Sequence, residues 1–323
     1  MQIYGIDLAK EKFDVSFFDL TSKKVSNKPS HKVVKNNFKS IGRFLETLPS
    51  DAVLVAEHTG VYGDTLLKCC MDSNVKIAFV GGYVIHRYRA TPDRAKTDVL
   101  DCALLREFGE RYPDKLKYRK FPEEALYELR QLARHREMLV EQRKQLMTAD
   151  KSEDCRPIRS LAVKRSMDRI KEMLKVINGH DSIHHNYEII KSVNGVGLVT
   201  AVELLVKTDN FTKITTARQY AAYAGTAPYE KSSGKMDKGA HISKIGNRRS
   251  KTLLYICAES ARLHNKEIKL YYERRTLIDK KPRHYVLNAI ANKLLRIIFT
   301  LVEKGEYYDA NFIRQDPRLV KHN

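Results

Sequence analysis

Two kinds of hydrophobic pattern alternate along the first hundred residues: short apolar runs typical of strands and longer amphipathic segments typical of helices. Strands are expected at residues 3–9, 13–20, 32–34, 52–56 and 77–80. Helices are expected at residues 38–48, 65–71 and 93–111. Because paired strands come first and strands then alternate with helices, the pattern predicts an α/β domain with a mixed sheet covered by helices.

The middle of the chain carries longer helical patterns. Residues 123–149 predict one helix, with apolar side chains at heptad spacing at Ala125, Leu132, Leu139 and Leu146. The pattern breaks at residues 150–157, and a second helix follows from Ile158. Together the two predict a helical hairpin or a coiled-coil arm, and an ordinary packed pair of helices would give the same pattern.

The last third of the chain is predicted to be mainly helical. Helices are expected at residues 219–224, 250–263 and 285–303, with a turn-rich stretch at 225–246. The changes of pattern predict three domains, at residues 1–115, 116–188 and 189–323.

Charge narrows the class of partner. The 323 residues include 59 Lys and Arg against 39 Asp and Glu, a net charge of +20. Such an excess favours a polyanionic partner such as nucleic acid, although a solubilising basic surface would have the same composition. The five cysteines contain no CxxC pair, which argues against a disulfide framework or a zinc ribbon. With no apolar run near ~20 residues and no signal peptide at the start, we expect a cytoplasmic protein without membrane partners.

Four carboxylates stand at positions suited to chemistry. Asp7 lies inside an apolar strand, Glu57 ends another, and Asp98 and Asp101 are three apart on one helix, which places their Cβ atoms ~5–6 Å apart. Such a set can hold two divalent ions ~3.5–4 Å apart, with Mg²⁺ or Mn²⁺ favoured over zinc by the oxygen ligands. The alternatives are surface charges at Asp98 and Asp101, a strand-end cap at Glu57, and a buried ion pair at Asp7.

A second candidate lies in the turn-rich stretch, where Ser232 and Ser233 precede Gly234. Basic residues surround these serines: Lys231, Lys235, Lys244, Arg248 and Arg249. A serine hydroxyl in such a patch can attack phosphorus while the cations hold phosphates. A flexible basic loop, in which serine is an ordinary turn residue, is the alternative.

Several motifs occur together in one order along the chain. They are Gly5-Ile6-Asp7-Leu8-Ala9-Lys10, Glu57-His58-Thr59-Gly60-Val61-Tyr62, Arg94-Ala95-Lys96-Thr97-Asp98-Val99-Leu100-Asp101, Tyr223-Ala224-Gly225-Thr226-Ala227-Pro228, Ser232-Ser233-Gly234 and Ile242-Ser243-Lys244-Ile245-Gly246-Asn247-Arg248-Arg249. The ordered set resembles the DEDD-type insertion-sequence transposases, the family of bridge-RNA-guided recombinases, over nearly the whole chain.

The resemblance implies a fold and a site. It implies an N-terminal RuvC-like domain of RNase H fold, whose Mg²⁺ ligands match Asp7, Glu57, Asp98 and Asp101, with Mn²⁺ as a possible substitute. It also implies a coiled-coil middle and a mainly α C-terminal transposase domain with a nucleophilic serine. That serine matches Ser233 because it directly precedes the family's glycine; Ser232 is second and Ser243 third.

The resemblance further implies the activity and the partners. The protein would be an RNA-guided DNA recombinase of a mobile insertion sequence, acting through a covalent phosphoserine intermediate. An element-encoded guide RNA would select donor and target DNA, and protomers of a homodimer or tetramer would share a composite site.

Three other functions fit parts of the pattern. A RuvC-like, junction-resolving nuclease would use the carboxylates without the serine. An actin-like or sugar-kinase ATPase would share the opening aspartate but needs further glycine-rich phosphate loops, of which we find no convincing pair. A non-catalytic RNA-binding protein would not need intact acid and serine motifs.

Overall fold

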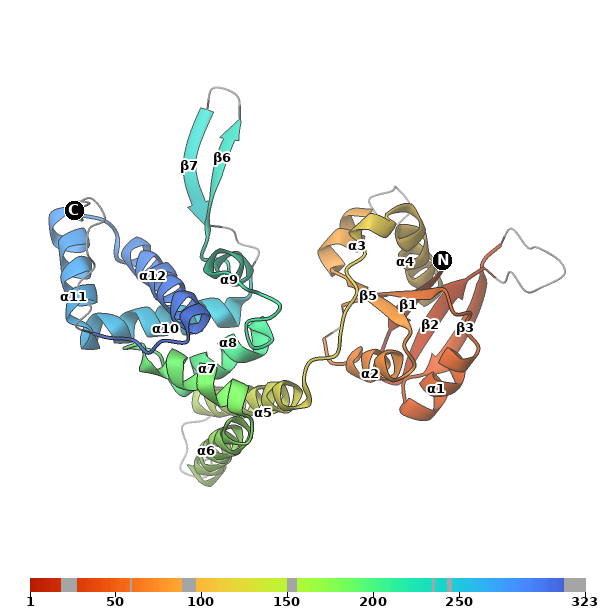
Figure 1. Cartoon of the computed structure of the whole chain (residues 1–323), viewed down its shortest axis with the longest axis horizontal. Coiled ribbons are helices and arrows are strands. Elements are labelled where there is room, and N and C mark those ends of the chain that lie inside the picture. The colour runs from red at the N-terminus through yellow and green to blue at the C-terminus, as the bar shows by residue number, and fades with distance from the viewer. Residues whose placement is uncertain are drawn as a thin grey trace, which may run out of the picture. The chain divides into compact units, whose positions relative to one another are not determined.

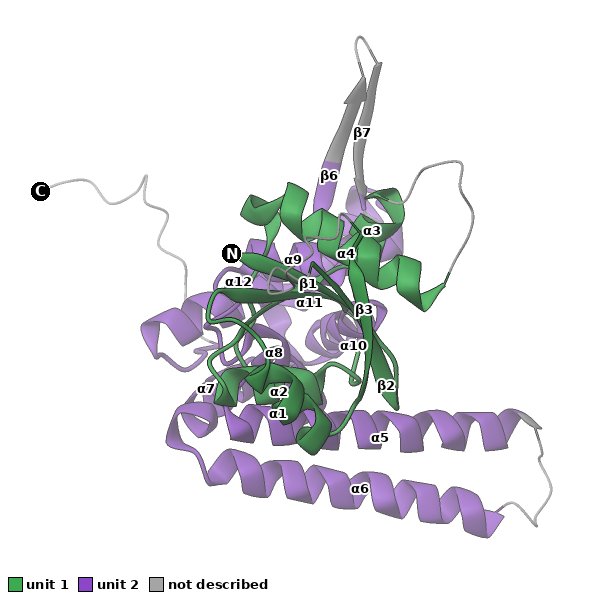
Figure 2. Ribbon diagram, turned by 90° about the vertical axis from the view of Figure 1, so that its right-hand side faces the viewer, with its two compact units in different colours: residues 1–121 green, residues 122–323 purple. Residues whose placement is uncertain are grey.

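The protein forms two compact units, residues 1–121 and 122–323 (Figures 1 and 2). The structure, a computed structural model, describes residues 1–18, 28–58, 60–88, 97–149, 156–233, 236–242 and 246–310, without the side chains of residues 149 and 230–241. The division into three domains expected from the sequence remains a prediction.

The N-terminal unit is built on one five-stranded sheet. Its strands are β1 (Gln2–Leu8), β2 (Lys12–Phe17), β3 (Ser30–Lys35), β4 (Ala52–Glu57) and β5 (Lys76–Val80). Their order in the sheet is β3-β2-β1-β4-β5, and β2 alone runs antiparallel to its neighbours. The predicted mixed sheet is therefore confirmed, and the RNase H-like fold stays a prediction.

Helices cover both faces of this sheet (Figure 1). They are α1 (Phe38–Glu46), α2 (Asp64–Asp72), α3 (Gly82–Tyr88) and α4 (Asp98–Arg111), followed by the short 3-10 turn η1 (Pro113–Lys115). Alternate residues of β1 point into two separate cores. Ile6 packs with Phe44 of α1 on one face, and Ile3 packs with Leu105 of α4 on the other. Odd-numbered residues of β1, including Gly5 and Asp7, therefore face α4.

The C-terminal unit is mostly helical, as predicted. Its helices are α5 (Glu124–Ala149), α6 (Arg156–Asn178), α7 (Asp181–Ser192), α8 (Leu198–Thr208), α9 (Ala217–Ala224), α10 (Arg248–His264), α11 (Lys266–Glu273), the π-helical turn η3 (Arg274–Ile278) and α12 (Arg283–Lys304). One core joins them, with Ile190 of α7, Leu204 of α8 and Leu295 of α12 all fully buried.

The long helices α5 and α6 run side by side as a hairpin (Figure 2). Leu129 of α5 and Met173 and Ile177 of α6 are buried where the hairpin joins the core of the unit. This contact lies within one chain, so it confirms the helical hairpin; an intermolecular coiled coil stays a prediction.

The turn-rich stretch of the sequence contains a two-stranded antiparallel ribbon, β6 (Pro228–Ser233) and β7 (Met236–Ile242), with a register shift between Glu230 and Ser232. The ribbon projects beyond α9 (Figure 1). Backbone pairing rather than an apolar alternation defines it, which is why the hydrophobic pattern does not reveal its strands.

Among the described residues, α12 is the one helix that is long and apolar enough to cross a membrane. A search for an uninterrupted apolar run of about 20 residues does not find α12, because charged residues interrupt its apolar sequence. Half of its apolar window is buried inside the unit, where Val286, Ile290 and Ile298 pack in the core. Its hydrophobicity is thus accounted for by its place as a core helix.

Candidate active site

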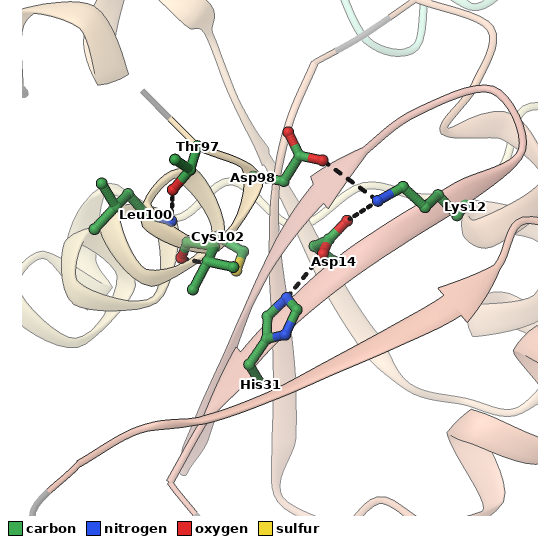
Figure 3. Close-up of polar contacts among 8 residues, drawn as sticks. Lys12, Asp14, His31, Thr97, Asp98, Leu100 and Cys102 are labelled. Carbon is green, nitrogen blue, oxygen red and sulfur yellow. Dashed lines mark hydrogen bonds and ion pairs between the residues drawn. The ribbon is translucent and has the colours of Figure 1, made fainter. Parts of the chain in front are cut away.

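Two aspartates face each other across the first two strands. In the antiparallel pair of β1 and β2, Asp7 stands directly opposite Asp14, so both side chains lie on the face covered by α4. Asp14 is 4% exposed, and each of its oxygens has a partner: His31 Nε2 lies 2.8 Å from Oδ1, and Lys12 Nζ lies 3.3 Å from Oδ2 (Figure 3). These partners stabilise a buried carboxylate that would otherwise be costly.

Glu57 reaches the same end of the sheet from β4. The parallel register pairs Ile6 with Ala56, so the residues that follow, Asp7 and Glu57, lie side by side at the carboxyl ends of their strands. Gly82 makes room for the Glu57 carboxylate, because a Cβ added there would lie 2.5 Å from Glu57 Oε1.

Helix α4 brings Asp98 and Asp101. It begins after Thr97, whose hydroxyl oxygen accepts the backbone N–H of Leu100 at 3.3 Å (Figure 3). The helix lies very close to β1 at Gly5, where an added Cβ would overlap the backbone of Cys102 and Arg106. This close approach places the first turn of α4, with its two acids, beside Asp7.

Lys12 links the helix to the sheet. Its Nζ lies 3.4 Å from Asp98 Oδ2 as well as 3.3 Å from Asp14 Oδ2, so one ammonium bridges α4 and β2 (Figure 3). The Lys12 and Asp98 side chains are 48% and 63% exposed, so both are open to solvent and to an incoming ligand.

The pKa of Asp7 shows that the acids form one electrostatic group. Burial, and after it the charges of Asp101, Asp98, Glu57 and Asp14 in that order, together raise this pKa to about 6. The four acids expected from the sequence are therefore brought together, with Asp14 as a fifth member.

The donor chemistry of this group fits a hard divalent cation. Carboxylate oxygens are the ligands that Mg²⁺ prefers, and a bound cation would relieve the repulsion that raises the pKa of Asp7. In the described part of the chain, however, no three Asp, Glu, His or Cys side chains are already arranged as a ligand set. A small rearrangement of exposed side chains such as Asp98 would therefore accompany metal binding.

The residues Lys12, Asp14 and His31 are absent from the sequence-based candidates. In the hydrophobic pattern, Lys12 belongs to a polar turn between two strands, and Asp14 is an ordinary strand position. A signal for Asp14 does exist: it lies between the apolar Phe13 and Val15, as Asp7 lies between Ile6 and Leu8. A hairpin centred on residues 10–11 pairs these two positions.

The serine candidates lie on the β6–β7 ribbon. The backbone of Ser232 pairs with Asp237 and that of Ser233 with Met236, at the end of β6. The side chains of both serines and of Lys231 are not among those described, and Lys235, Ser243 and Lys244 lie outside the described residues.

The two predicted basic contacts on α10 have different surroundings. Arg248 is exposed at the first position of the helix. Arg249 is an internal ion-pair residue: its Nη1 lies 2.6 Å from Glu137 Oε1 on α5, and its Nε donates to Glu203 Oε2 on α8 at 3.3 Å. Glu203, 4% exposed, also accepts the Ser250 hydroxyl at 2.7 Å. Two carboxylates thus already balance the Arg249 charge.

Two family models match the chain. A DEDD transposase model of the IS110 group matches residues 4–152, and the model of the Transposase IS116/IS110/IS902 family matches residues 187–273. The chain belongs to this family of transposases. All four clustered acids lie within the first match, and the ribbon and α10 within the second. This transposase is accordingly a DNA-acting enzyme.

Curated relatives of the transposase agree with this assignment. It is 24% identical over 319 residues to the pilin gene-inverting protein of Moraxella bovis, covering 94% of this chain and 97% of the relative. It is 31% identical over 121 residues to the IS1111A transposase of Coxiella burnetii, covering 37% of this chain. It is also 31% identical over 134 residues to the uncharacterized 43.6 kDa protein of insertion element IS110 from Streptomyces coelicolor, covering 42% of this chain. The last two matches each span 33% of the relative.

Among solved structures, the transposase is similar to RuvC of T. thermophilus in complex with a Holliday junction substrate. The TM-score is 0.28 at 13% identity, over 37% of this chain and 99% of that chain.

Proposed function

We propose that this transposase is an RNA-guided DNA recombinase of a mobile insertion sequence, which cuts and rejoins DNA through a Mg²⁺-dependent acid cluster and a covalent phosphoserine intermediate. The observation that carries the proposal is the convergence of the four acids on one end of the sheet, expressed in the raised pKa of Asp7. Family membership supports the DNA substrate, and the ordered motifs support the guide RNA.

The acid cluster would hold the cation through Asp7, Glu57, Asp98 and Asp101. Bound there, Mg²⁺, or Mn²⁺ in its place, would orient the scissile phosphate and neutralise charge that develops on its oxygens. The chain's own residues prepare the site: Gly5 and Gly82 allow the acids to approach, and a bound cation would replace Lys12 beside Asp98.

Ser233 is the proposed nucleophile. Its Oγ loses its proton and forms a bond to phosphorus, while the bond from phosphorus to one strand oxygen breaks and that oxygen takes up a proton. In the second step the hydroxyl of the incoming strand attacks phosphorus, and the Ser233 Oγ leaves with a proton. The end of a ribbon that projects beyond its helices suits a residue that must reach a DNA backbone.

The basic surface is proposed to bind nucleic acid backbones. Arg248 is exposed for such contacts, and Lys231, Lys235 and Lys244 follow in the same stretch of sequence. The proposed partners are an element-encoded guide RNA, donor DNA and target DNA, with a homodimer or tetramer assembling them in the cytoplasm. The net charge of +20 supports these partners.

The experiment that tests the mechanism traps the covalent adduct. The transposase is purified from cells that carry its native flanking DNA, bound RNA is sequenced, and labelled donor DNA is incubated with Mg²⁺ before denaturing electrophoresis. We expect one discrete RNA, and an adduct that Ser233→Ala and Asp7→Asn abolish while Ser232→Ala retains it. Metal-dependent cleavage without any adduct would instead establish the nuclease that uses the carboxylates alone, and heterogeneous RNA would refute guidance.

A further inference from the structure

A cavity of about 390 Å³ lies in the C-terminal unit, away from the ribbon motifs. Its lining comes from the end of α11, the turn η3 and the beginning of α12, and includes Tyr271, Arg275, Lys281 and Tyr285. Val286, 2% exposed, and Ala289 close it with an apolar surface. None of these residues belongs to the acid cluster or the serine motif.

The lining has the composition of a nucleotide site. Tyr285 is 57% exposed, and its ring centroid lies 4.7 Å from that of the exposed His284, which tilts against it by 39°. Tyr271 supplies a second ring, which the Arg274 guanidinium approaches at 5.8 Å from the centroid. Aromatic faces beside cations bind unstacked bases, because every base has a π-face and every nucleotide carries a phosphate.

Positive charge concentrates around the cavity. Residues 262–285 contain eight Lys and Arg against three acids. Arg262 and Arg283 pair with Glu259, and Arg275 pairs with Asp279 at 2.6 Å. Exposed Lys281, at the rim, adds a further cation.

The backbone at the cavity favours an anion as well. Helix α12 begins directly after Pro282, which makes no side-chain capping hydrogen bond, so the positive end of a 22-residue helix lies at the rim. The opposite wall contains the π-helical turn η3, followed by Lys280 at a φ of +49°. Both are uncommon backbone features that frequently mark functional sites.

We infer that this cavity binds an unpaired nucleotide of a single-stranded nucleic acid, with the base stacked on Tyr285 and a phosphate held by Lys281 and the beginning of α12. A base within a duplex is stacked on its neighbours and does not enter. The site is separate from the phosphoryl-transfer chemistry proposed above, and it stands or falls independently of that chemistry.

The test measures binding in EDTA, where no cleavage occurs. Fluorescence anisotropy of labelled dT12, rU12 and a 12-base-pair duplex is followed with wild-type protein and with the variants Tyr285→Ala and Tyr285→Phe. Tyr307→Ala is the matched control, because Tyr307 is 58% exposed and lies outside the cavity. We expect Tyr285→Ala to weaken single-strand binding about tenfold. Tyr285→Phe, Tyr307→Ala and all duplex affinities should stay within about twofold of wild type.

A second variant tests the phosphate contact. Lys281→Ala should lower the slope of log affinity against log salt by about 0.7 for single strands, the value for one phosphate contact. If the variants lose affinity for both dT12 and rU12, the cavity recognises the base and phosphate that DNA and RNA share. If they lose affinity for rU12 alone, the ligand is RNA. Unchanged single-strand affinity in Tyr285→Ala, or an equal loss in Tyr307→Ala, would overturn the inference.

Discussion

Asp7 and Asp14 occupy directly opposed positions in the β1–β2 pair, yet their carboxylates have different surroundings. Asp14 is buried against His31 and Lys12, whereas the pKa of Asp7 is raised to about 6 by burial and by four neighbouring acids. Asp14 thus already has a histidine and a lysine as partners, whereas Asp7 is a carboxylate that gains from a bound cation.

The raised pKa of Asp7 predicts a specific pH dependence of stability. Between its ordinary value of 3.8 and about 6, the folded state holds a proton that the unfolded state has lost, so stability falls as pH rises through this window and stays lower above it. The shift corresponds to ~3 kcal/mol at most, and solvent screening reduces it to ~1–2 kcal/mol. We expect Asp7→Asn to raise the melting temperature at pH 8 in EDTA by about 2–6 °C, with little change at pH 4.

Calorimetry at the two pH values, with and without Mg²⁺, checks this prediction. Mg²⁺ should stabilise the wild-type protein at pH 8 and have a smaller effect on Asp7→Asn. A lower melting temperature for Asp7→Asn at pH 8 would show that the carboxylates do not repel one another in the folded protein.

Gly5→Ala should destabilise the N-terminal unit, because the added methyl group overlaps the backbone of α4 at Cys102 and Arg106. Displacing a packed helix costs about 1–3 kcal/mol or more, and it moves Asp98 and Asp101 away from Asp7. Gly42→Ala is the matched control. Gly42 lies within α1, and no atom lies within 4 Å of a Cβ added there. Gly42→Ala should therefore raise the free energy of unfolding by about 0.5–1 kcal/mol. Urea denaturation measures the free energy of unfolding. A value for Gly5→Ala equal to that of wild type would contradict the close packing of β1 and α4.

Lys12→Met should tighten Mn²⁺ binding. The Lys12 ammonium neutralises part of the charge on Asp98 and Asp14, and a metal ion competes with it for Asp98. Removing this unit charge ~4 Å from the metal, in a solvent-exposed setting, should raise the Mn²⁺ affinity roughly fivefold. Isothermal titration calorimetry measures it, with Lys10→Met as the control from the same exposed turn. Weaker Mn²⁺ binding by Lys12→Met alone would show that Lys12 organises the ligands rather than competes with the cation.

Arg248→Ala and Arg249→Ala should separate DNA binding from stability. Arg249→Ala leaves Glu203 buried without its guanidinium partner, which should cost about 1–3 kcal/mol of unfolding free energy. Arg248 is exposed, so Arg248→Ala should change stability by less than about 0.5 kcal/mol and lower the salt slope of DNA binding by about 1. Chemical denaturation and anisotropy titrations with duplex DNA measure the two effects. If Arg249→Ala instead lowered the salt slope of DNA binding and left stability unchanged, Arg249 would have to leave its ion pairs to contact DNA.

Local patterns are enough to predict the mixed sheet, the long helices of the hairpin and the four acids. A carboxylate in an apolar strand, and two carboxylates three residues apart on a helix, reveal themselves through a few neighbouring residues. Because such patterns involve only neighbouring residues, they do not predict the β6–β7 ribbon. That ribbon is defined by hydrogen bonding between the backbones of two strands.

The sequence by itself determined the alternation of strands and helices, the positive charge, and the ordered motifs that mark the family. Only the tertiary structure decided that Asp14 joins Asp7, that Gly5 lets α4 approach, and that Arg249 serves an internal ion pair while Arg248 remains exposed. The reason is physical. Whether a charge is buried, paired or available depends on residues far away in the chain that folding brings within a few ångströms, and periodicity along the chain carries no record of those distances.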